Sequence, residues 1–593
     1  MSHASSFADR IARLPELGVG ISTEFGASRS GVDPLELRSS HGEFARFLEI
    51  GADLDRGMDA TAQAWISTGA PTTYHFLDAN LEDPSSLTND WMNSTAALAR
   101  QANAVWLCGD AGLWHAGARD RGHGLLQPPI LEPASARLMA ESVVRLREAT
   151  GFEVLPENPP AHVYLGRLHL LDYWARVADH ADSAILIDLA HLAVYQRVTG
   201  HAPLDGFTDF PWWRVVEIHV AGGSPFRHAG KIFVDDDHGV EPLPELWDML
   251  DFVMGRANNL RAVVVECERN PIQQVVPLFQ RVVNAWNASA PTRQPHARAA
   301  STQLVRSEDP TPTLAPNALM PLQRFLFRCE LDVGLARAWR AGDSVSRQGD
   351  GLEPIARDLL IAAPIEGVTA DHGGRRAAQV LGNASLECSA TVALAMDHQA
   401  DPGFVAEFVR TDHFHNTVAS QGRLPIGFAS YAVERVKTRD DRFLKSVAYL
   451  EQALVSVRRT SPGPRPSKGT LGVSGAVAVV ACPEGTLDGW LAVLAALRNG
   501  KLNGLPRPEL GDEDEFILLS PGACIDAFKV PTGAAEILDP GTASLLRAAA
   551  ISPLAEEDLL AIARDFEVDV AEVRELSASL VRDGVLLAGD SAS

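Results

Sequence analysis

The sequence has few cysteines, and no two of them are spaced as a Cys-x-x-Cys pair. Six cysteines are scattered over 593 residues, which fits reduced thiols better than a disulfide framework. Residues 1–17 lack the positive stretch followed by an apolar one that marks a secretory signal. The sequence also lacks an apolar run of the roughly 18 residues that a membrane helix needs. We therefore expect a soluble, cytoplasmic protein.

Positive charge is also scarce in this chain. It has 52 Lys and Arg residues against 76 Asp and Glu residues, for a formal net charge of −24. This balance argues against a surface that binds nucleic acid by neutralising phosphates. Hydrophobic residues make up 46% of the chain, enough for sizeable cores, and the length predicts several domains.

The first half of the chain alternates short apolar runs with longer helical patterns. This alternation is typical of a parallel sheet wrapped by helices, and eight strand–helix units are the usual content of a TIM-type (β/α)8 barrel. We therefore predict an α/β barrel over residues 1–286. The eight expected strands lie at residues 18–25, 44–51, 72–77, 103–108, 152–158, 183–189, 215–222 and 261–268.

The remainder of the chain predicts a mainly helical region with a small mixed unit at its end. Residues 287–318 are rich in Ala, Pro, Thr and Ser and read as a linker. A helical pattern follows over 319–460, and residues 470–593 begin with strand-like segments. From about residue 539 the pattern predicts three helices followed by a strand, which is typical of a winged-helix-like module.

Polar residues fall at the carboxyl ends of the expected barrel strands, where the active sites of such barrels are built. A carboxylate at the end of a buried apolar strand is costly unless it is paired or bound to metal. Histidines mixed with carboxylates form a ligand set that suits iron, manganese or zinc. The candidate residues are His75, Glu157, Asn158, Asp188, His191, Glu217, His219, Asp236, His238 and Glu266, with Asp236 and His238 expected in the loop after the seventh strand.

Taken singly, these residues have ordinary structural explanations. His75 alone fits a hydrogen-bonded core histidine, and Asp188 alone fits a helix N-cap. Cys108 and Cys267 adjoin strand ends, but buried free cysteine usually behaves as a small hydrophobe. The run Asp412-His413-Phe414-His415 resembles a metal tetrad but stands alone in the helical region, so surface histidines explain it better. The cluster at matching strand ends carries the metal prediction.

The order of these motifs resembles the multinuclear non-haem iron-dependent oxidative enzymes, the family that includes the methanobactin maturase. The matching phrases are LGVGI, YHFLD, PENPP, IDLAH, EIHVAG, DDDHG and VVECERN, spread over residues 15–285. The resemblance implies a xylose-isomerase-like barrel that modifies a ribosomally made precursor peptide, usually at cysteine. It implies two or three iron ions and O2 as co-substrate.

By this resemblance the metal ligands are His75, Glu157, Asp188, His191, His219, Asp236, His238 and Glu266, with Asn158 as a ligand or a partner of one. Four of them, His75, Asp188, His219 and Glu266, are the residues on which we expect catalysis to depend. The fourth strand departs from the family pattern, because Ala111 stands where a histidine is usual. Asp110 or His115 would then take that position.

The resemblance also implies a partner protein that presents the peptide, and residues 319–593 look like such a partner fused in cis. The winged-helix-like module would bind the leader of the precursor peptide, for example by strand addition. Two alternatives remain open. The same barrel type carries metal-dependent hydrolases and isomerases, similar to apurinic endonucleases and sugar isomerases, and an inert barrel would leave a peptide-binding scaffold.

Overall fold

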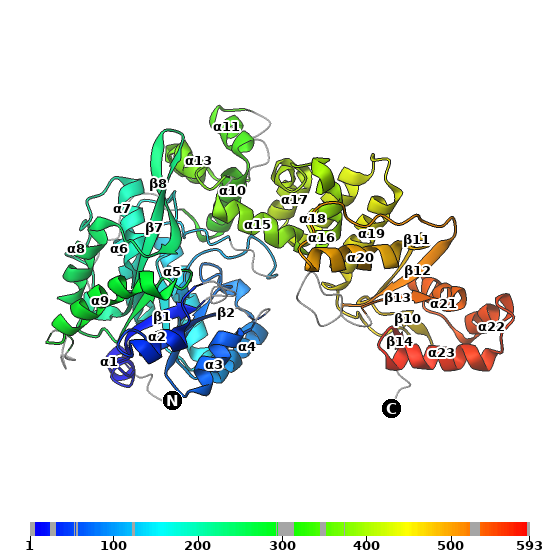
Figure 1. Cartoon of the computed structure of the whole chain (residues 1–593), viewed down its shortest axis with the longest axis horizontal. Helices are drawn as coiled ribbons and strands as arrows, with labels where there is room; N and C mark the ends of the chain where they lie inside the picture. Colours follow the sequence, from blue (N-terminus) through cyan, green and yellow to red (C-terminus); the bar gives the residue numbers. More distant parts are fainter. Residues whose placement is uncertain are drawn as a thin grey trace. The chain divides into compact units, whose positions relative to one another are not determined.

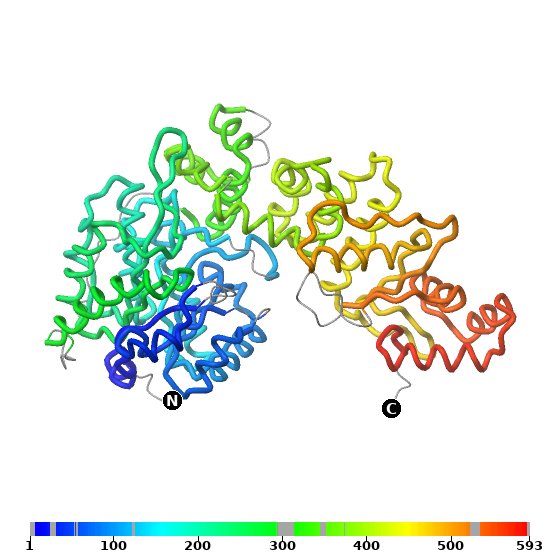
Figure 2. The backbone as a smooth tube through the Cα atoms, in the orientation of Figure 1, coloured from blue at the N-terminus to red at the C-terminus, as the bar shows by residue number. Residues whose placement is uncertain are grey.

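The structure is a computed structural model of the whole chain. It describes residues 6–23, 31–52, 54, 57–120, 125–291, 293, 314–343, 351–372, 374–521 and 534–589. The chain forms two compact units, Met1–Val380 and Leu381–Ser593, which Figures 1 and 2 show in the colours of the sequence. No helix in the described residues is long and apolar enough to cross a membrane.

The first unit contains a closed barrel of eight parallel strands, as the sequence predicts. The strand order is β6-β5-β4-β3-β2-β1-β9-β7, and a pairing between β6 and β7 closes the circle. The strands are β1 (Gly18–Thr23), β2 (Leu48–Ala52), β3 (Thr72–Phe76), β4 (Ala104–Asp110), β5 (Val154–Glu157), β6 (Ile185–Asp188), β7 (Val215–His228) and β9 (Ala262–Glu266). The expected residues 24 and 25 of the first strand lie outside the described residues.

Helices connect the strands, as the alternating pattern predicts. Most are amphipathic, and their apolar side chains share one large core with the outward-facing residues of the strands. They are α2 (Pro34–Ser40), α3 (Ala60–Ser67), α4 (Asn89–Gln101), α5 (Pro133–Thr150), α6 (Leu170–Ala181), α7 (Leu189–Thr199), α8 (Pro244–Met254) and α9 (Ile272–Ala288). A short helix α1 (Phe7–Ile11) precedes the first strand.

The barrel interior is apolar at one end and polar at the other. A separate buried cluster joins Phe7 and Ile11 of α1 to Trp106, Leu155 and Val264 on the strands. Because side chains alternate between the two faces of a strand, the residue two positions further along each strand also points into the barrel. Those positions carry Cys108, Glu157 and Glu266, so the polar residues predicted at the strand ends face inward.

One part of the first unit differs from the prediction. Asp236 and His238 were expected in a loop, but they lie on a ninth strand, β8 (Lys231–Gly239), which pairs antiparallel with β7. Ala229 and Gly230 form the two-residue turn, both with positive φ (48° and 82°), as hairpin turns of this length require. The loop prediction was wrong because the Ala-Gly turn signal was overlooked.

The first compact unit extends beyond residue 286, the predicted end of the barrel. Helices after the linker segment pack on the loops that follow β4 and β5, in a core where Ile130 and Val163 meet Leu322, Phe325 and Trp339. These helices are α10 (Pro316–Leu331), α11 (Val333–Arg340), α13 (Pro354–Ala362) and α14 (Ile365–Val368), and α15 (Arg375–Ser385) follows them. Most of residues 287–318, the predicted linker, lie outside the described residues.

Helix α10 also buries a carboxylic acid against the barrel. Glu82 is buried, its Oε2 accepts a hydrogen bond of 2.6 Å from Nε2 of Gln323 on α10, and burial raises its pKa to about 8 despite that bond. In the unfolded chain the same acid ionises near its usual value of 4.5. Its contribution to stability is therefore present at low pH and is lost as pH rises towards 8.

We expect Glu82→Gln, which imitates the protonated acid, to flatten this pH dependence. The variant should melt close to wild type at pH 5 and at a higher temperature at pH 8, with a gain of more than about 1 kcal/mol, since one pKa unit corresponds to about 1.4 kcal/mol. Thermal melts of both proteins across this pH range would measure the difference. Parallel wild-type and variant curves would show that Glu82 does not hold its proton in the folded chain.

The second unit contains helices and two small sheets. Its helices include α16 (Ser389–Met396), α17 (Asp412–Ala419), α18 (Leu424–Val436), α19 (Arg442–Val457) and α20 (Thr486–Arg498). An antiparallel sheet has the order β11 (Ala478–Pro483), β12 (Asp514–Leu519), β13 (Ala535–Leu538). The chain then forms α21 (Pro540–Ile551), α22 (Glu556–Asp565), α23 (Val570–Arg582) and β14 (Leu586–Ala588), which pairs with β10 (Leu471–Val473). These are the three helices and final strand that the sequence predicts.

Candidate metal centre

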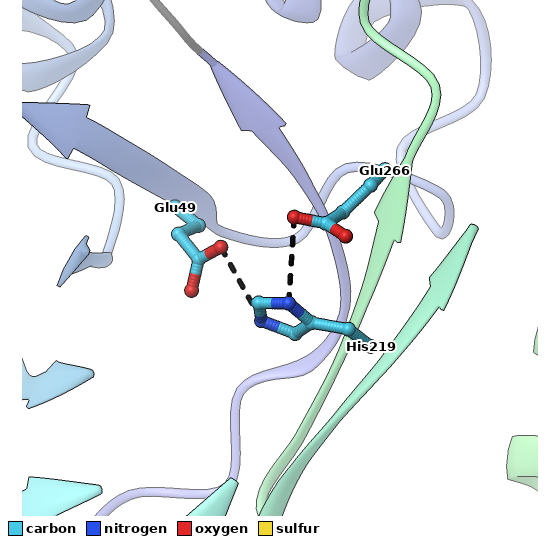
Figure 3. A group of neighbouring side chains, drawn as sticks. All are labelled: Glu49, His219 and Glu266. Carbon is cyan, nitrogen blue, oxygen red and sulfur yellow. Dashed lines mark ion pairs between the residues drawn. The ribbon is translucent and has the colours of Figure 1, made fainter. Parts of the chain in front are cut away.

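Among the close groups of buried metal-type residues in the described part of the chain, three combine acids with histidine, and they lie at the polar end of the barrel. In the first, the imidazole of His219 on β7 lies between Glu49 of β2 and Glu266 of β9, and Figure 3 shows the three side chains converging. His219 Nε2 is 3.3 Å from Glu49 Oε1, and its Nδ1 is 3.4 Å from Glu266 Oε1. Histidine nitrogen with two carboxylate oxygens is a donor set that divalent iron, manganese or zinc accepts.

The second and third groups share Glu157, the last residue of β5. One joins it to His75 of β3 and Asp110 of β4, and the other joins it to Asp188 and His191. His75 Nε2 is 2.9 Å from Glu157 Oε2, and His191 Nδ1 is 3.7 Å from Glu157 Oε1. Glu157 Oε1 also lies 3.2 Å from His219 Nδ1. One carboxylate therefore touches all three groups, as a bridging ligand would.

The hairpin strand β8 brings two more predicted residues to this cluster. Asp236 Oδ2 lies 3.4 Å from His191 Nε2 and 3.6 Å from His238 Nε2. His238 adopts φ of +54°, a conformation that is rare for a side chain of this size and that clusters at functional sites. Donor atoms at this spacing can bind the same ion, because an ion at about 2.0–2.2 Å from each of them fits between them.

Several buried donor atoms of the cluster make no hydrogen bond within the described residues. They are Oδ1 of Asp110, Oδ2 of Asp188, both ring nitrogens of His219, Oδ1 of Asp236 and Oε2 of Glu266. A buried polar atom without a partner costs free energy that a bound cation would recover. The donor set and its unpaired atoms therefore fit a metal cluster.

Burial and charge in the cluster raise the pKa values of its histidines and of one carboxyl group. Burial lowers the pKa of His75, but the hydrogen bond to Glu157 and the charges of the neighbouring carboxylates raise it to about 10. The same balance raises the pKa values of His191, His219 and His238. Burial raises the pKa of Asp188 to about 7. In the absence of metal, protons on the histidines therefore supply the positive charge that the neighbouring carboxylates favour.

The remaining predicted residues have different positions. The amide of Asn158 bonds both the main-chain oxygen and the main-chain N–H of Asp188, so it holds that residue in place. Glu217 is deeper in the barrel, where Trp106 Nε1 donates to it at 2.7 Å. Of the two substitutes considered on the fourth strand, Asp110 joins a group, whereas the ring nitrogens of His115 face the oxygens of Asp78 and Gly117.

Two acidic residues at the site were missed from the sequence. Glu49 lies inside β2 rather than at its end, yet it contacts His219. Glu268 follows β9 by two residues, and its Oε1 lies 2.7 Å from His238 Nδ1 while its Oε2 accepts from Ser22. An acidic residue inside the apolar run FARFLEIG, and the i, i+2 pair of acids in VVECERN, were the available signals.

We expect Glu268→Gln to weaken metal binding by roughly 10–100-fold, the usual cost of losing a carboxylate partner behind a metal-binding histidine. The carboxylate fixes the ring of His238 so that Nε2 faces Asp236, and an amide does this less strongly. Competition with a chelating dye would measure the affinity. The matched control is Glu245→Gln on α8, an acid paired with Arg197 outside the cluster. An unchanged affinity in Glu268→Gln would rule out this orienting role.

The cluster opens into a cavity of about 380 Å³. The metal-type residues form its floor, and apolar side chains such as Leu77, Trp114 and Val194 form part of its wall. Arg375 and Arg376, from beyond the linker segment, border it as well. The cavity gives a substrate side chain access to the cluster.

The Asp412–His415 run lies in the second unit on α17. His413 borders a separate cavity with Asp401, Tyr431 and Arg435. The run belongs to none of the close metal-type groups found in the described part of the chain.

Comparison with known proteins identifies the barrel segment. Residues 35–288 match the family described as RiPP precursor modification enzyme MbnB/TglH/ChrH, so the resemblance expected from the sequence is confirmed over that segment. RiPP denotes a ribosomally synthesised and post-translationally modified peptide. Proteins designated UPF0276 are similar at low identity: one from Anaeromyxobacter sp. (strain Fw109-5) is 24% identical over 243 residues, covering 38% of this chain and 83% of that protein. One from Rhizobium meliloti (strain 1021) is 23% identical over 224 residues, covering 37% and 72%.

The similarity to solved structures is distant. A xylose isomerase-like TIM barrel protein from Mycobacterium smegmatis, in complex with magnesium, has a TM-score of 0.30 and 11% identity, covering 48% of this chain and 99% of that chain. The 3-keto-D-glucoside 4-epimerase from E. coli has a TM-score of 0.28 and 14% identity, covering 46% and 99%.

Proposed function

We propose that this chain, whose residues 35–288 match the RiPP precursor modification enzymes, is a multinuclear iron enzyme that uses O2 to modify a precursor peptide, at cysteine. The observation that carries the proposal is the set of three acid and histidine groups at the polar end of the barrel, two of which contain Glu157 while the third contacts it through His219. Together these residues offer a mixed nitrogen and oxygen donor set for more than one ion, which agrees with the family match.

The residues that would hold the ions are those of the three groups together with Asp236 and His238 of β8. They are His75, Glu157, Asp188, His191, His219, Asp236, His238 and Glu266 from the sequence prediction, with Asp110, one of the two substitutes predicted on the fourth strand, and Glu49, which its contacts add. Iron bound here would supply redox chemistry with O2 and would favour a deprotonated substrate thiol. Histidine binds a metal ion as the neutral imidazole, so the ions would take the place of the protons that the neighbouring carboxylates favour on the four histidines.

The chain's own residues would bind and orient the substrate. Leu77, Trp114 and Val194 line the cavity beside the cluster, and they would pack on the substrate side chain and exclude water from it. Asn158 and Glu268 would fix Asp188 and His238, respectively, through the hydrogen bonds that they make. Rigid positioning of this kind places a reactive group beside its reaction partner.

The second unit would present the peptide. Within the described residues, β13 is the last strand of its sheet, and its residue Ile537 is 53% exposed. An outer strand of this kind can accept an extended peptide by strand addition. The three helices and final strand that follow fit a winged-helix-like module that binds the leader, and the fusion would make a separate partner protein unnecessary. The free, buried cysteines of the described residues are consistent with a cytoplasmic location.

Metal analysis of the full chain purified without oxygen would test the proposal. Elemental analysis with Mössbauer spectroscopy should find two or three iron ions per chain, partly coupled to each other. The iron-loaded chain should then consume O2 and change the mass of its precursor peptide, taken from a short coding sequence near its own. Stoichiometric zinc or manganese with little iron would instead favour a hydrolase or isomerase of the same barrel type.

A further inference from the structure

The strand that carries Asp236 and His238 needs support from outside the barrel. Within the described residues, β8 pairs only with β7 and ends the sheet. A two-stranded hairpin is marginally stable by itself, so its outer side requires another contact to hold it in place. Residues 369–372 and 374–376, which follow α14 and are called the support segment below, supply that contact.

His162 links this segment to β8. Its Nδ1 lies 2.8 Å from Asp371 Oδ1, and its Nε2 lies 2.9 Å from the main-chain oxygen of Val234. Both partners are acceptors, so both ring nitrogens donate and the ring is a cation. Arg376 pairs with the other oxygen of Asp371 at 3.2 Å and donates to the main-chain oxygen of Pro160. The loop after β5 and the strand β8 are thus tied to one aspartate.

Arg375 reaches β8 directly. Its Nη1 donates a 2.6 Å hydrogen bond to the main-chain oxygen of Asp236, and its Nη2 lies 3.4 Å from the carboxylate of Asp235. Nearer the hairpin turn, His228 Nε2 lies 2.8 Å from Thr369 Oγ1. The contact of Arg375 falls on the same residue whose side chain lies between His191 and His238.

We propose that Arg375 is a positioning residue for the metal centre, and that the support segment completes the site from beyond the linker. The inference rests on the proposed function, because it assumes that Asp236 and His238 bind metal. Arg375 holds the main chain of Asp236 so that its carboxylate stays between the two imidazoles. Without this contact the hairpin moves away from the cluster more often, and the ion that Asp236 binds is held less tightly.

The guanidinium group is suited to this task, because its planar fork can bond a carbonyl and a carboxylate at once. Arg375 is exposed while its two partners lie on β8, so its removal leaves no buried charge unpaired. Loss of fold is therefore not expected from an alanine at this position. The loss of metal affinity should be confined to the ion that Asp236 and His238 of β8 bind.

The experiment measures Co²⁺ binding to the full-length chain by visible absorption, in wild type and Arg375→Ala. We expect one Co²⁺ per chain to bind about tenfold or more weakly in the variant, the usual effect of removing a partner of a metal ligand, while the other ions and the melting temperature stay unchanged. The matched control is Arg340→Ala on α11, an arginine that also donates to a main-chain oxygen, that of Ala363.

Each outcome separates the inference from the proposed function. Equal Co²⁺ affinity in wild type and Arg375→Ala would overturn the positioning role while leaving the metal centre intact. The same weakening in Arg340→Ala would also overturn it, since the effect would then be general. A wild-type chain that binds no Co²⁺ and no iron would contradict the proposed function, and the inference would fall with it.

Discussion

Replacing His219 with asparagine should remove one metal ion per chain and reduce peptide modification by more than about 100-fold. Loss of a residue that only supports a metal ligand usually costs roughly 10–100-fold, and loss of the ligand itself should cost more. His219 is fully buried, and its ring lies within 3.4 Å of three carboxylates, those of Glu49, Glu157 and Glu266. An amide lacks the basic nitrogen that would bind an ion between them. The three acids would then face one another without that ion.

The measurement is iron content by elemental analysis, together with turnover of the precursor peptide by mass spectrometry. Circular dichroism of the variant separates loss of metal from loss of fold. His201→Asn is the matched control, because His201 is a partly exposed histidine of the same unit that contacts only Asp205 among the ion pairs found. If His219→Asn kept the iron content and turnover of wild type, the group around His219 would not be part of the metal centre.

The barrel was predictable because its signal repeats. Each apolar run followed by a helical pattern marks one strand and one helix, and eight of them leave little choice of fold. The ends of the strands were predictable for the same reason, since polar residues such as Glu157, Asp188 and Glu266 interrupt apolar runs at matching places. The structure places all three at one end of the barrel.

The register of the strands was not predictable, and it decides which residues meet. Glu49 lies opposite Thr73, whereas His75 lies opposite Gly51, yet the carboxylate of Glu49 meets His219 of β7, a strand that does not pair with β2. Strand stagger is a property of the closed barrel rather than of any one segment. For this reason Glu49 was missed while the residues at the strand ends were found.

The hairpin of β7 and β8 illustrates a second limit of prediction from the sequence. The phrase DDDHG was recognised as a source of ligands, but its strand was not, because the Ala-Gly turn before it was overlooked and β8 has many polar residues. Its support comes from Asp371 and Arg375, more than a hundred residues later. Contacts of this range arise only in the folded chain, and the sequence of the barrel segment carries no sign of them.

Removal of the proposed metal ions should destabilise the polar end of the barrel, called its mouth here, more than any other part of the chain. The acids of the cluster are buried beside one another, and one oxygen each of Asp110, Asp188 and Glu266 makes no hydrogen bond within the described residues. An ion that binds only the folded state stabilises it by about 4 kcal/mol at a free concentration 1,000 times its dissociation constant. Loss of the two or three proposed ions would therefore outweigh the effect of most single substitutions.

Hydrogen exchange of the full chain, before and after dialysis against a chelator, would locate this loss. We expect faster exchange in peptides that contain β6, β8 and the residues after β9, which together carry Asp188, Asp236 and Glu268. Helices α21, α22 and α23 belong to the other compact unit and serve as the internal reference. Equal protection at the mouth with and without chelator would mean that the acids and histidines are held by their protons alone. Faster exchange restored by iron would mean that the energy of metal binding is also the energy that orders the mouth.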